Sequence, residues 1–187
     1  MKKVIEQKLV DFLGFLGALV IVIPIISVLL YIGIPEFRDW VSQTLHPSPL
    51  AGQLNEYINI LPIESPDLGH PYLAGKIVIV DIQTKRIARV NSNSALDAIR
   101  ANDPKEVGTI IWLDCQEQVV GTYGSLGTAY QTSCTLTVID KGNNMIVGKE
   151  MFAGPQPPSL SQNGLDQHGG PPSDDDIVNY ILSLPKR

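Results

Sequence analysis

Basic side chains are scarce in this sequence, and they form no basic stripe along it. The 187 residues hold 14 lysines and arginines against 19 aspartates and glutamates, which gives a formal net charge of −5. A nucleic-acid-binding surface needs a basic patch or stripe, so a nucleic-acid partner is excluded. The length is enough for one modest domain with attachments.

Cysteine and histidine are equally sparse. There are two cysteines, Cys115 and Cys134, and they form no C-x-x-C motif, so a redox pair is disfavoured. A metal site built on two thiolates needs two more ligands, and His46, His70 and His168 have no ligand spacing. The glycine-rich segment "GTYGSLGT" has neither the lysine nor the strand–loop–helix context of a phosphate-binding loop. We therefore expect no metal and no cofactor.

A long apolar run lies near the N-terminus. Residues 12–34 contain no charged side chain, and a helix of that length spans a hydrocarbon core of about 30 Å. The run is too long for the h-region of a cleaved signal peptide, which has about 7–15 residues. The sequence therefore predicts an N-terminal transmembrane helix that anchors the chain in a lipid bilayer.

The basic residues beside this run predict its orientation. Three lysines precede it and only Arg38 follows it closely, and basic flanks stay in the cytoplasm. Residues 1–11 are then cytoplasmic and the main domain is extracytoplasmic. Residues 35–45 form either a short interfacial helix or an extension of the membrane helix. Residues 46–53 read as a linker, so that residues 35–54 connect the membrane helix to a domain over 55–187.

The first half of that domain mixes broken and regular segments. Residues 55–75 carry three prolines and are expected to wrap the domain without regular structure. Residues 76–83 are nearly all apolar and β-branched, which predicts a strand buried on both faces. The chain then turns at Thr84 and Lys85, and Asn93 or Ser94 caps a short helix.

A long hairpin follows. Gly124-Ser125 predicts a two-residue turn, and centring the hairpin there makes paired residue numbers sum to 249. Because positions two apart share a face, one face is then mostly apolar and the other polar, apart from Trp112. The predicted pairs on the apolar face are Tyr123–Leu126, Val119–Tyr130, Cys115–Cys134, Leu113–Leu136 and Ile111–Val138.

This register places the two cysteines opposite each other. Directly opposed residues of antiparallel strands have Cα atoms about 4.5–5.5 Å apart, within the range that a disulfide bridges. An extracytoplasmic domain lies in an oxidising compartment, so a structural Cys115–Cys134 disulfide is predicted. Two buried free thiols are the alternative if the topology is inverted.

The C-terminal half completes a small α+β fold. "DKGNN" predicts a second turn into a strand at residues 145–152, and residues 153–172 read as a Pro/Gly-rich loop. Ser173 caps a helix over 174–184, whose apolar stripe of Ile177, Tyr180, Ile181 and Leu184 packs on the sheet. The predicted fold class is thus a transmembrane helix followed by an antiparallel meander of about four strands, packed by a C-terminal helix.

The acidic and histidine side chains outline no reaction centre. The run Asp174 to Asp176 lacks the ligand pattern of a calcium loop and suits a helix N-terminus. Asp67 and His70 have no nucleophile beside them, and nothing brings Asp81, Asp114 and Glu117 together. We therefore predict no catalytic residue.

Three segments, "LGHPYLAGKIVIVD", "EVGTIIWLDC…GTY…AYQTSCTLTVID" and "PPSDDDIVNYILSLP", resemble a group of bacterial proteins that have an N-terminal membrane helix and a small β-rich domain. The group has no established activity, so the resemblance implies one folded domain from His70 onward and no functional residue.

Two functions remain after this reading. The first is a non-enzymatic, membrane-anchored interaction module or accessory subunit of a membrane or envelope assembly, because sheet edges and Pro-rich loops are common partner surfaces. The alternative is an envelope hydrolase or small-ligand-binding domain, which needs a pocket with convergent polar groups.

Overall fold

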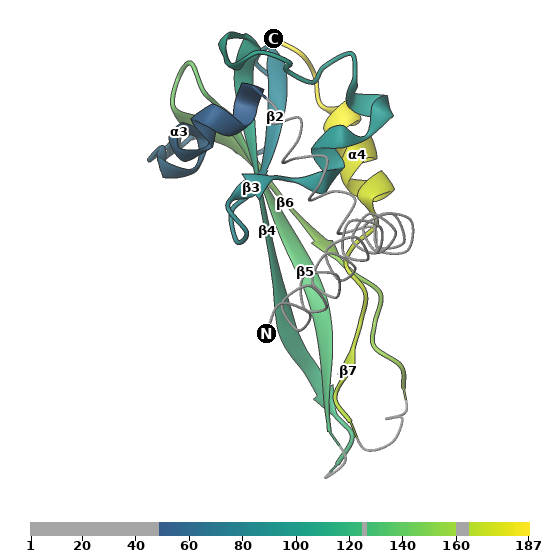
Figure 1. Ribbon diagram of the computed structural model, residues 1–187. Helices are drawn as coiled ribbons and strands as arrows, with labels where there is room; N and C mark the ends of the chain where they lie inside the picture. The colour runs from purple at the N-terminus through teal and green to yellow at the C-terminus, as the bar shows by residue number, and fades with distance from the viewer. Residues whose placement is uncertain (1–48, 125–126, 160–164) are drawn as a thin grey trace, which may run out of the picture. The chain divides into compact units, whose positions relative to one another are not determined.

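The computed structural model describes residues 49–124, 127–159 and 165–187. They belong to the second of two compact units into which the chain divides, Ser48–Arg187. Within them seven strands form one sheet in the order β1-β6-β5-β4-β2-β3, with β7 paired to β5 (Figure 1). The strands are β1 Ile63–Glu64, β2 Lys76–Asp81, β3 Arg86–Ile87, β4 Val107–Thr122, β5 Thr128–Asp140, β6 Met145–Ala153 and β7 Gln167–His168.

The sheet is mixed. Strands β4, β5 and β6 form an antiparallel meander, and β2 and β3 form a short antiparallel hairpin. Three pairs are parallel instead: β2 with β4, β1 with β6, and β7 with β5. Parallel neighbours require the chain to cross over between strands, and the residues between β2 and β4 form that crossover.

Strand β2 shows how both faces of the sheet are buried. Its apolar side chains alternate between two core clusters: Ile77 and Ile79 belong to one, Val78 and Val80 to the other. The first cluster is completed by helix α4, Asp174–Ser183, and by the 3-10 turns η2 (Arg89–Ser92) and η3 (Ser94–Leu96).

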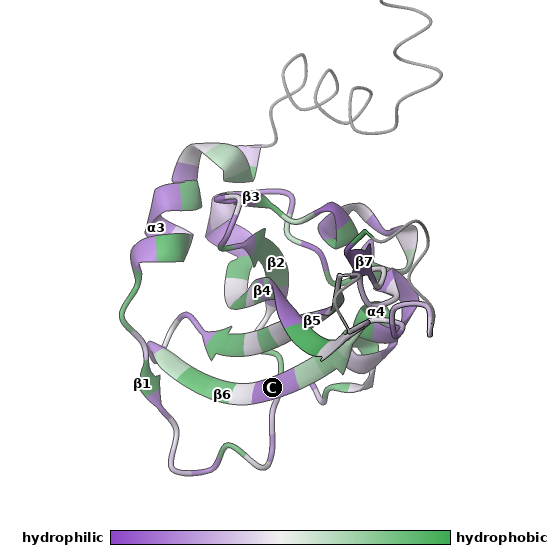
Figure 2. Cartoon of the chain, turned by 90° about the horizontal axis from the view of Figure 1, so that it is seen from below, coloured by the Kyte–Doolittle hydropathy of each residue, from purple (hydrophilic) through white to green (hydrophobic). Residues whose placement is uncertain are grey.

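The second cluster is closed by the first described helical segment of the chain. Leu50 of the 3-10 turn η1, Pro49–Gln53, and Tyr57 of helix α3, Leu54–Asn59, are both buried in it. In Figure 2 the α3 ribbon alternates between hydrophilic and hydrophobic residues, as expected of a helix with one covered side. Helical structure therefore covers both faces of the sheet.

A close backbone approach fixes the start of β4. A Cβ atom on Gly108 would lie 1.7 Å from the carbonyl oxygen of Ala74, so only glycine lets the two segments meet. Beside it, the Thr109 hydroxyl accepts a hydrogen bond from the Ala74 amide at 2.7 Å. The segment that leads into β2 is thereby held against the beginning of β4.

Helix α4 follows the predicted pattern. The Ser173 hydroxyl accepts a hydrogen bond from the Asp175 amide at 3.2 Å and caps the helix. Ile177, Ile181 and Leu184 are buried in the first core cluster, and Tyr180 packs against it. The prediction that the C-terminal helix packs on the sheet through this stripe is confirmed.

The predicted fold class is wrong for the sheet, and its transmembrane helix is not supported. The sheet is a mixed one of seven described strands rather than an antiparallel meander of about four. The crossover between β2 and β4 adds one parallel pair, and three two-residue strands have too little sequence pattern to be recognised. The N-terminal transmembrane helix is not supported: residues 12–34 lie outside the described part of the chain, and no helix within that part is long and apolar enough to span a membrane.

Local predictions were corrected in three places. The described part of the predicted linker is helical, as η1, and residues 55–75 contain most of α3 and all of β1. Residues 153–172, predicted as a loop, contain β7. Asn93 does cap a helix, since its side chain accepts from the Ala95 amide, but the helix is the 3-10 turn η3.

The burial of α4 generates the first prediction. Ile181 has no exposed surface, whereas Leu182 is 46% exposed. Ile181→Ala should lower the free energy of unfolding by about 2–5 kcal/mol, the usual loss for a buried large-to-small change. Leu182→Ala is the matched control and should change it by about 0.5 kcal/mol or less. Urea unfolding followed by circular dichroism measures both, and equal effects would contradict the packing described.

Candidate functional site: a stapled hairpin arm

Strands β4 and β5 continue far beyond the layered body (Figure 1). The core clusters reach as far as Leu113 on β4 and Leu136 on β5. Beyond them β4 is half-buried and then mostly exposed to its end at Thr122. We call this extension the arm and define it as residues 114–124, 127–134 and 165–170.

A disulfide lies at the base of the arm. Cys115 pairs with Cys134 in the β4–β5 ladder, their Cα atoms lie 3.9 Å apart, and the two sulfur atoms are bonded. The pairs Leu113–Leu136 and Ile111–Val138 also stand in the predicted register. The predicted disulfide and its register are confirmed, and Trp112 lies on the opposite face, where its indole Nε1 donates to the Tyr57 carbonyl at 2.8 Å.

The register changes near the tip of the arm. Val119 still pairs with Tyr130, but Gly121 pairs with Ala129, so one extra residue on β4 forms a bulge. The Tyr123 amide donates to the Gly127 carbonyl at 2.9 Å. The predicted two-residue turn, with Tyr123 opposite Leu126, is therefore wrong by one residue.

Strand β7 covers the outer edge of β5 in the arm. The Gly154 amide donates to the Thr132 carbonyl, and the Gly169 amide donates to the Tyr130 carbonyl, both at 2.8 Å. A Cβ atom on Gly154 would lie 2.1 Å from the Gly170 carbonyl oxygen, so glycine permits the returning chain to lie this close. The loop after β6 thus supplies β5 with a second neighbour.

Side chains bind the three strands of the arm together. The His168 ring of β7 stacks on the Tyr130 ring of β5, with centroids 4.9 Å apart. The His168 Nδ1 also lies 2.9 Å from a carboxylate oxygen of Glu117 on β4. These contacts run across one face of the arm and hold β7 in place.

No described strand covers the outer edge of β4 in the arm. The Ile82 amide donates to the Leu113 carbonyl at 3.1 Å, so the backbone groups of Leu113 point away from β5. Backbone groups alternate sides along a strand, and those of Cys115, Glu117 and Val119 therefore point the same way. Strand β2 ends opposite Leu113, and no strand among the described residues pairs with β4 beyond it.

The arm is acidic. Its described residues contain three carboxylates, on Asp114, Glu117 and Asp166, and neither lysine nor arginine. Lysine and proline are the usual residues that keep a free strand edge from pairing, and neither occurs along the outer edge of β4. The open edge therefore combines unpaired backbone groups with a negative surrounding charge.

Asp67 and His70, considered as an acid–base pair, are in contact. The His70 Nδ1 lies 2.8 Å from a carboxylate oxygen of Asp67, and the two side chains are 81% and 65% exposed. No third acidic side chain among the described residues joins them through a hydrogen bond or ion pair. An exposed pair of this kind lacks the desolvated surroundings that catalysis by two groups requires.

The other acidic side chains considered in the sequence analysis stabilise turns and local contacts. Asp81 accepts from the amides of Gln83 and Thr84 at 2.9 Å and shapes the β2–β3 turn. Asp114 accepts from the Gln83 side chain at 2.7 Å. Asp174 pairs with Arg89 at 2.8 Å. No group of three potential metal ligands comes together within residues 49–124, 127–159 and 165–187.

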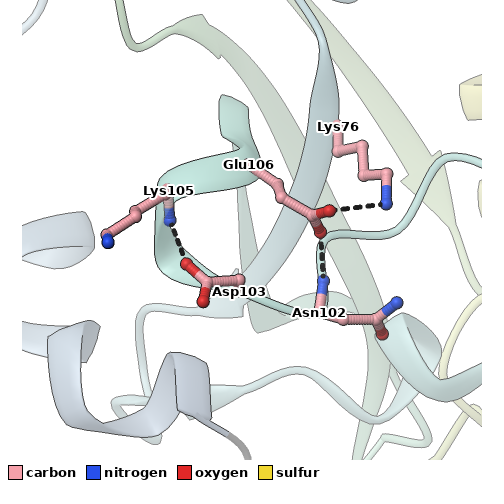
Figure 3. Close-up of polar contacts among 5 residues, drawn as sticks. All are labelled: Lys76, Asn102, Asp103, Lys105 and Glu106. Carbon is pink, nitrogen blue, oxygen red and sulfur yellow. Dashed lines mark hydrogen bonds and ion pairs between the residues drawn. The ribbon is translucent and has the colours of Figure 1, made fainter.

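A polar cluster that the sequence reading missed holds the crossover (Figure 3). The Glu106 carboxylate accepts from the Asn102 amide and from the Lys76 ammonium, both at 3.0 Å. These two hydrogen bonds lower the pKa of Glu106. Asp103 accepts from the Lys105 amide at 2.8 Å and caps the 3-10 turn η4, Pro104–Glu106. The cluster ties the end of the crossover to the start of β2.

A second missed cluster surrounds Asp140 at the end of β5. Its carboxylate accepts from the Tyr72 hydroxyl and the Asn143 side chain, each at 2.8 Å. Burial would raise the pKa of Asp140, but the hydrogen bonds outweigh it and hold the pKa below its ordinary value. The Arg187 guanidinium lies 4.0 Å from the Tyr72 ring centroid. Residues far apart in sequence form this cluster, so no local sequence motif predicts it.

No protein-family model matches this chain, and the comparisons with curated proteins and with solved structures found no match.

The disulfide generates the second prediction. Replacing both cysteines, Cys115→Ser with Cys134→Ser, should lower the free energy of unfolding by about 2–4 kcal/mol, because the unfolded chain regains the freedom of a closed loop. Amide hydrogen exchange should quicken in the arm while α4 stays protected. A double variant with unchanged stability would contradict a structural role.

The Glu106 cluster generates a prediction about pH. A carboxylate whose folded pKa is depressed stabilises the fold above its unfolded pKa, and this contribution is lost as the pH falls through the folded pKa. The ordinary value for Glu106 is 4.5. Glu106→Gln should therefore lower the melting temperature at about pH 7, and the difference from the parent should shrink below about pH 4.

The exposed carboxylate of Glu150 provides the control. Glu150→Gln, measured by the same thermal melts, should follow the parent at every pH. A Glu106→Gln difference that stays constant with pH would show that its charge contributes nothing to stability.

Proposed function

We propose that this protein is a non-enzymatic interaction module that works outside the cytoplasm, and that its arm is the surface that meets a partner. The observation that carries the proposal is the open outer edge of β4 in the arm, beside a β5 edge that β7 covers. Free strand edges bind extended segments of other chains.

Two further features support this role. The disulfide at Cys115 and Cys134 limits how far the arm can fray, and a preorganised surface loses less entropy when a partner binds. Disulfides persist in oxidising compartments, which favours a location outside the cytoplasm. The exposed polar clusters described above serve turns and caps rather than converging on one point.

Site-specific photocrosslinking in the producing cells tests the proposal. A photoreactive amino acid at Gln116 or Gln118, both exposed on the arm, should give a discrete adduct with one partner. The same group at Asn179, exposed on α4, is the matched control and should give none. Mass spectrometry identifies the adduct. No adduct from the arm, or equal adducts from α4, would sink the proposal.

A further inference from the structure

We infer that the arm binds an extended, basic polypeptide segment, which adds to the sheet as a new strand along β4 between Cys115 and Val119. This inference rests on the proposed function and specifies its partner. The segment is defined by its chemistry: a β-forming stretch with lysine or arginine at alternate positions.

The backbone geometry defines the binding row. The backbone groups of Cys115, Glu117 and Val119 point away from β5, whereas Gln116 and Gln118 use theirs in the ladder with β5. This row continues the line along which β2 pairs with β4, and it begins where β2 ends opposite Leu113. A new strand therefore meets donors and acceptors already spaced for a sheet.

Charge decides what kind of strand fits. One face of the row carries Glu117, whose carboxylate also lies 2.9 Å from His168 Nδ1. The other face carries Asp114, which also accepts from the Gln83 side chain, with Gln116 and Gln118 beyond it. No lysine or arginine lies in the described arm to repel a basic segment or to neutralise its three carboxylates. Opposite charges on neighbouring strands stabilise a sheet and like charges destabilise it, so a basic segment is preferred over an acidic one.

A second copy of the chain fits less well. Antiparallel pairing of two arms about a twofold axis at Glu117 would place this carboxylate opposite its own copy. The formal net charge of −5 on each chain adds further repulsion. A basic partner meets neither the repulsion between two Glu117 carboxylates nor the repulsion between two negatively charged chains.

The sheet has another open edge, which serves as an internal control. Strand β1 pairs with only the first two residues of β6. Because the Thr132 carbonyl faces the β6 side, alternation leaves the backbone groups of Lys149 and Met151 pointing outward on β6. This edge carries the ammonium of Lys149, which pairs with Glu64, whereas the described arm has no lysine or arginine, so the β6 edge is less suited to a basic strand.

The test uses the full chain and a fluorescent peptide of about nine residues in which lysine alternates with valine. Fluorescence anisotropy should show saturable binding, and a peptide with glutamate in place of lysine should bind at least about tenfold more weakly. Equal affinity of the two peptides would overturn the charge argument.

Three variants locate the contact. Glu117→Pro removes an outward amide without removing a hydrogen bond to β5, and should weaken binding by about tenfold or more. Glu117→Ala keeps that amide and should weaken binding by only about threefold. Met151→Pro makes the same backbone change on β6 and should leave binding unchanged. Equal losses for the two proline variants, or for both Glu117 variants, would overturn strand addition at β4.

Amide hydrogen exchange of the unsubstituted protein gives an answer that does not depend on a variant folding. Peptide binding should slow exchange at Cys115, Glu117 and Val119 and leave Gln116 and Gln118 as they were. No slowing at the first three amides overturns the inference. If the exchange test fails but photocrosslinking still finds a partner on the arm, strand addition is rejected and the proposed function stands. If the exchange test and the crosslinking both fail, the inference and the proposed function are both wrong.

Discussion

The antiparallel pairing of β4 with β5 is the constraint on which the rest of this domain depends. One continuous register runs from Thr109 to Val119, and it serves both the buried body and the exposed arm. Since side chains alternate between faces, a slip of one residue would move Trp112 to the α4 side and separate Cys115 from Cys134. The two core clusters and the disulfide at the base of the arm therefore specify the same alignment.

The body and the arm differ in what surrounds that pairing. In the body, helical segments cover both faces, and β2 and β6 flank the two strands. In the arm, β5 keeps a second neighbour, β7, whereas no described strand lies beside β4 on its other edge. The same two strands thus pass from a core that stabilises the fold to a region in which no described strand pairs with the outer edge of β4.

Local patterns predicted the hairpin, its disulfide and α4, because turn residues, alternation and a helix cap all act over a few positions. The hairpin register was right as far as the Val119–Tyr130 pair, and the turn beyond it was wrong. The turn at the tip is one residue longer than predicted, and the bulge beyond Val119 takes up the difference, so that the Cys115–Cys134 pair was unaffected. A bulge has no distinctive residue type, and only the paired strand reveals it.

Contacts between segments far apart in the sequence were not predicted, because local patterns do not encode them. Strands of two residues, such as β1 and β7, have no alternation to recognise, and their pairing is decided by distant strands. The helical cover from η1 and α3 was missed, although Trp112 on an otherwise polar face was a signal that something apolar covers it. The open edge of β4 depends on where β2 ends, which no pattern within β4 itself encodes.

The disulfide also determines how the arm responds to force. A load applied at the tip across the strands would peel β4 from β5 one hydrogen bond at a time, and this opening stops at the covalent link between Cys115 and Cys134. A load along β4 acts instead on the whole ladder in shear, together with its parallel pairing to β2. A chain paired along the outer edge of β4, as proposed above, would pull in this second direction and would load the ladder in shear rather than peel it.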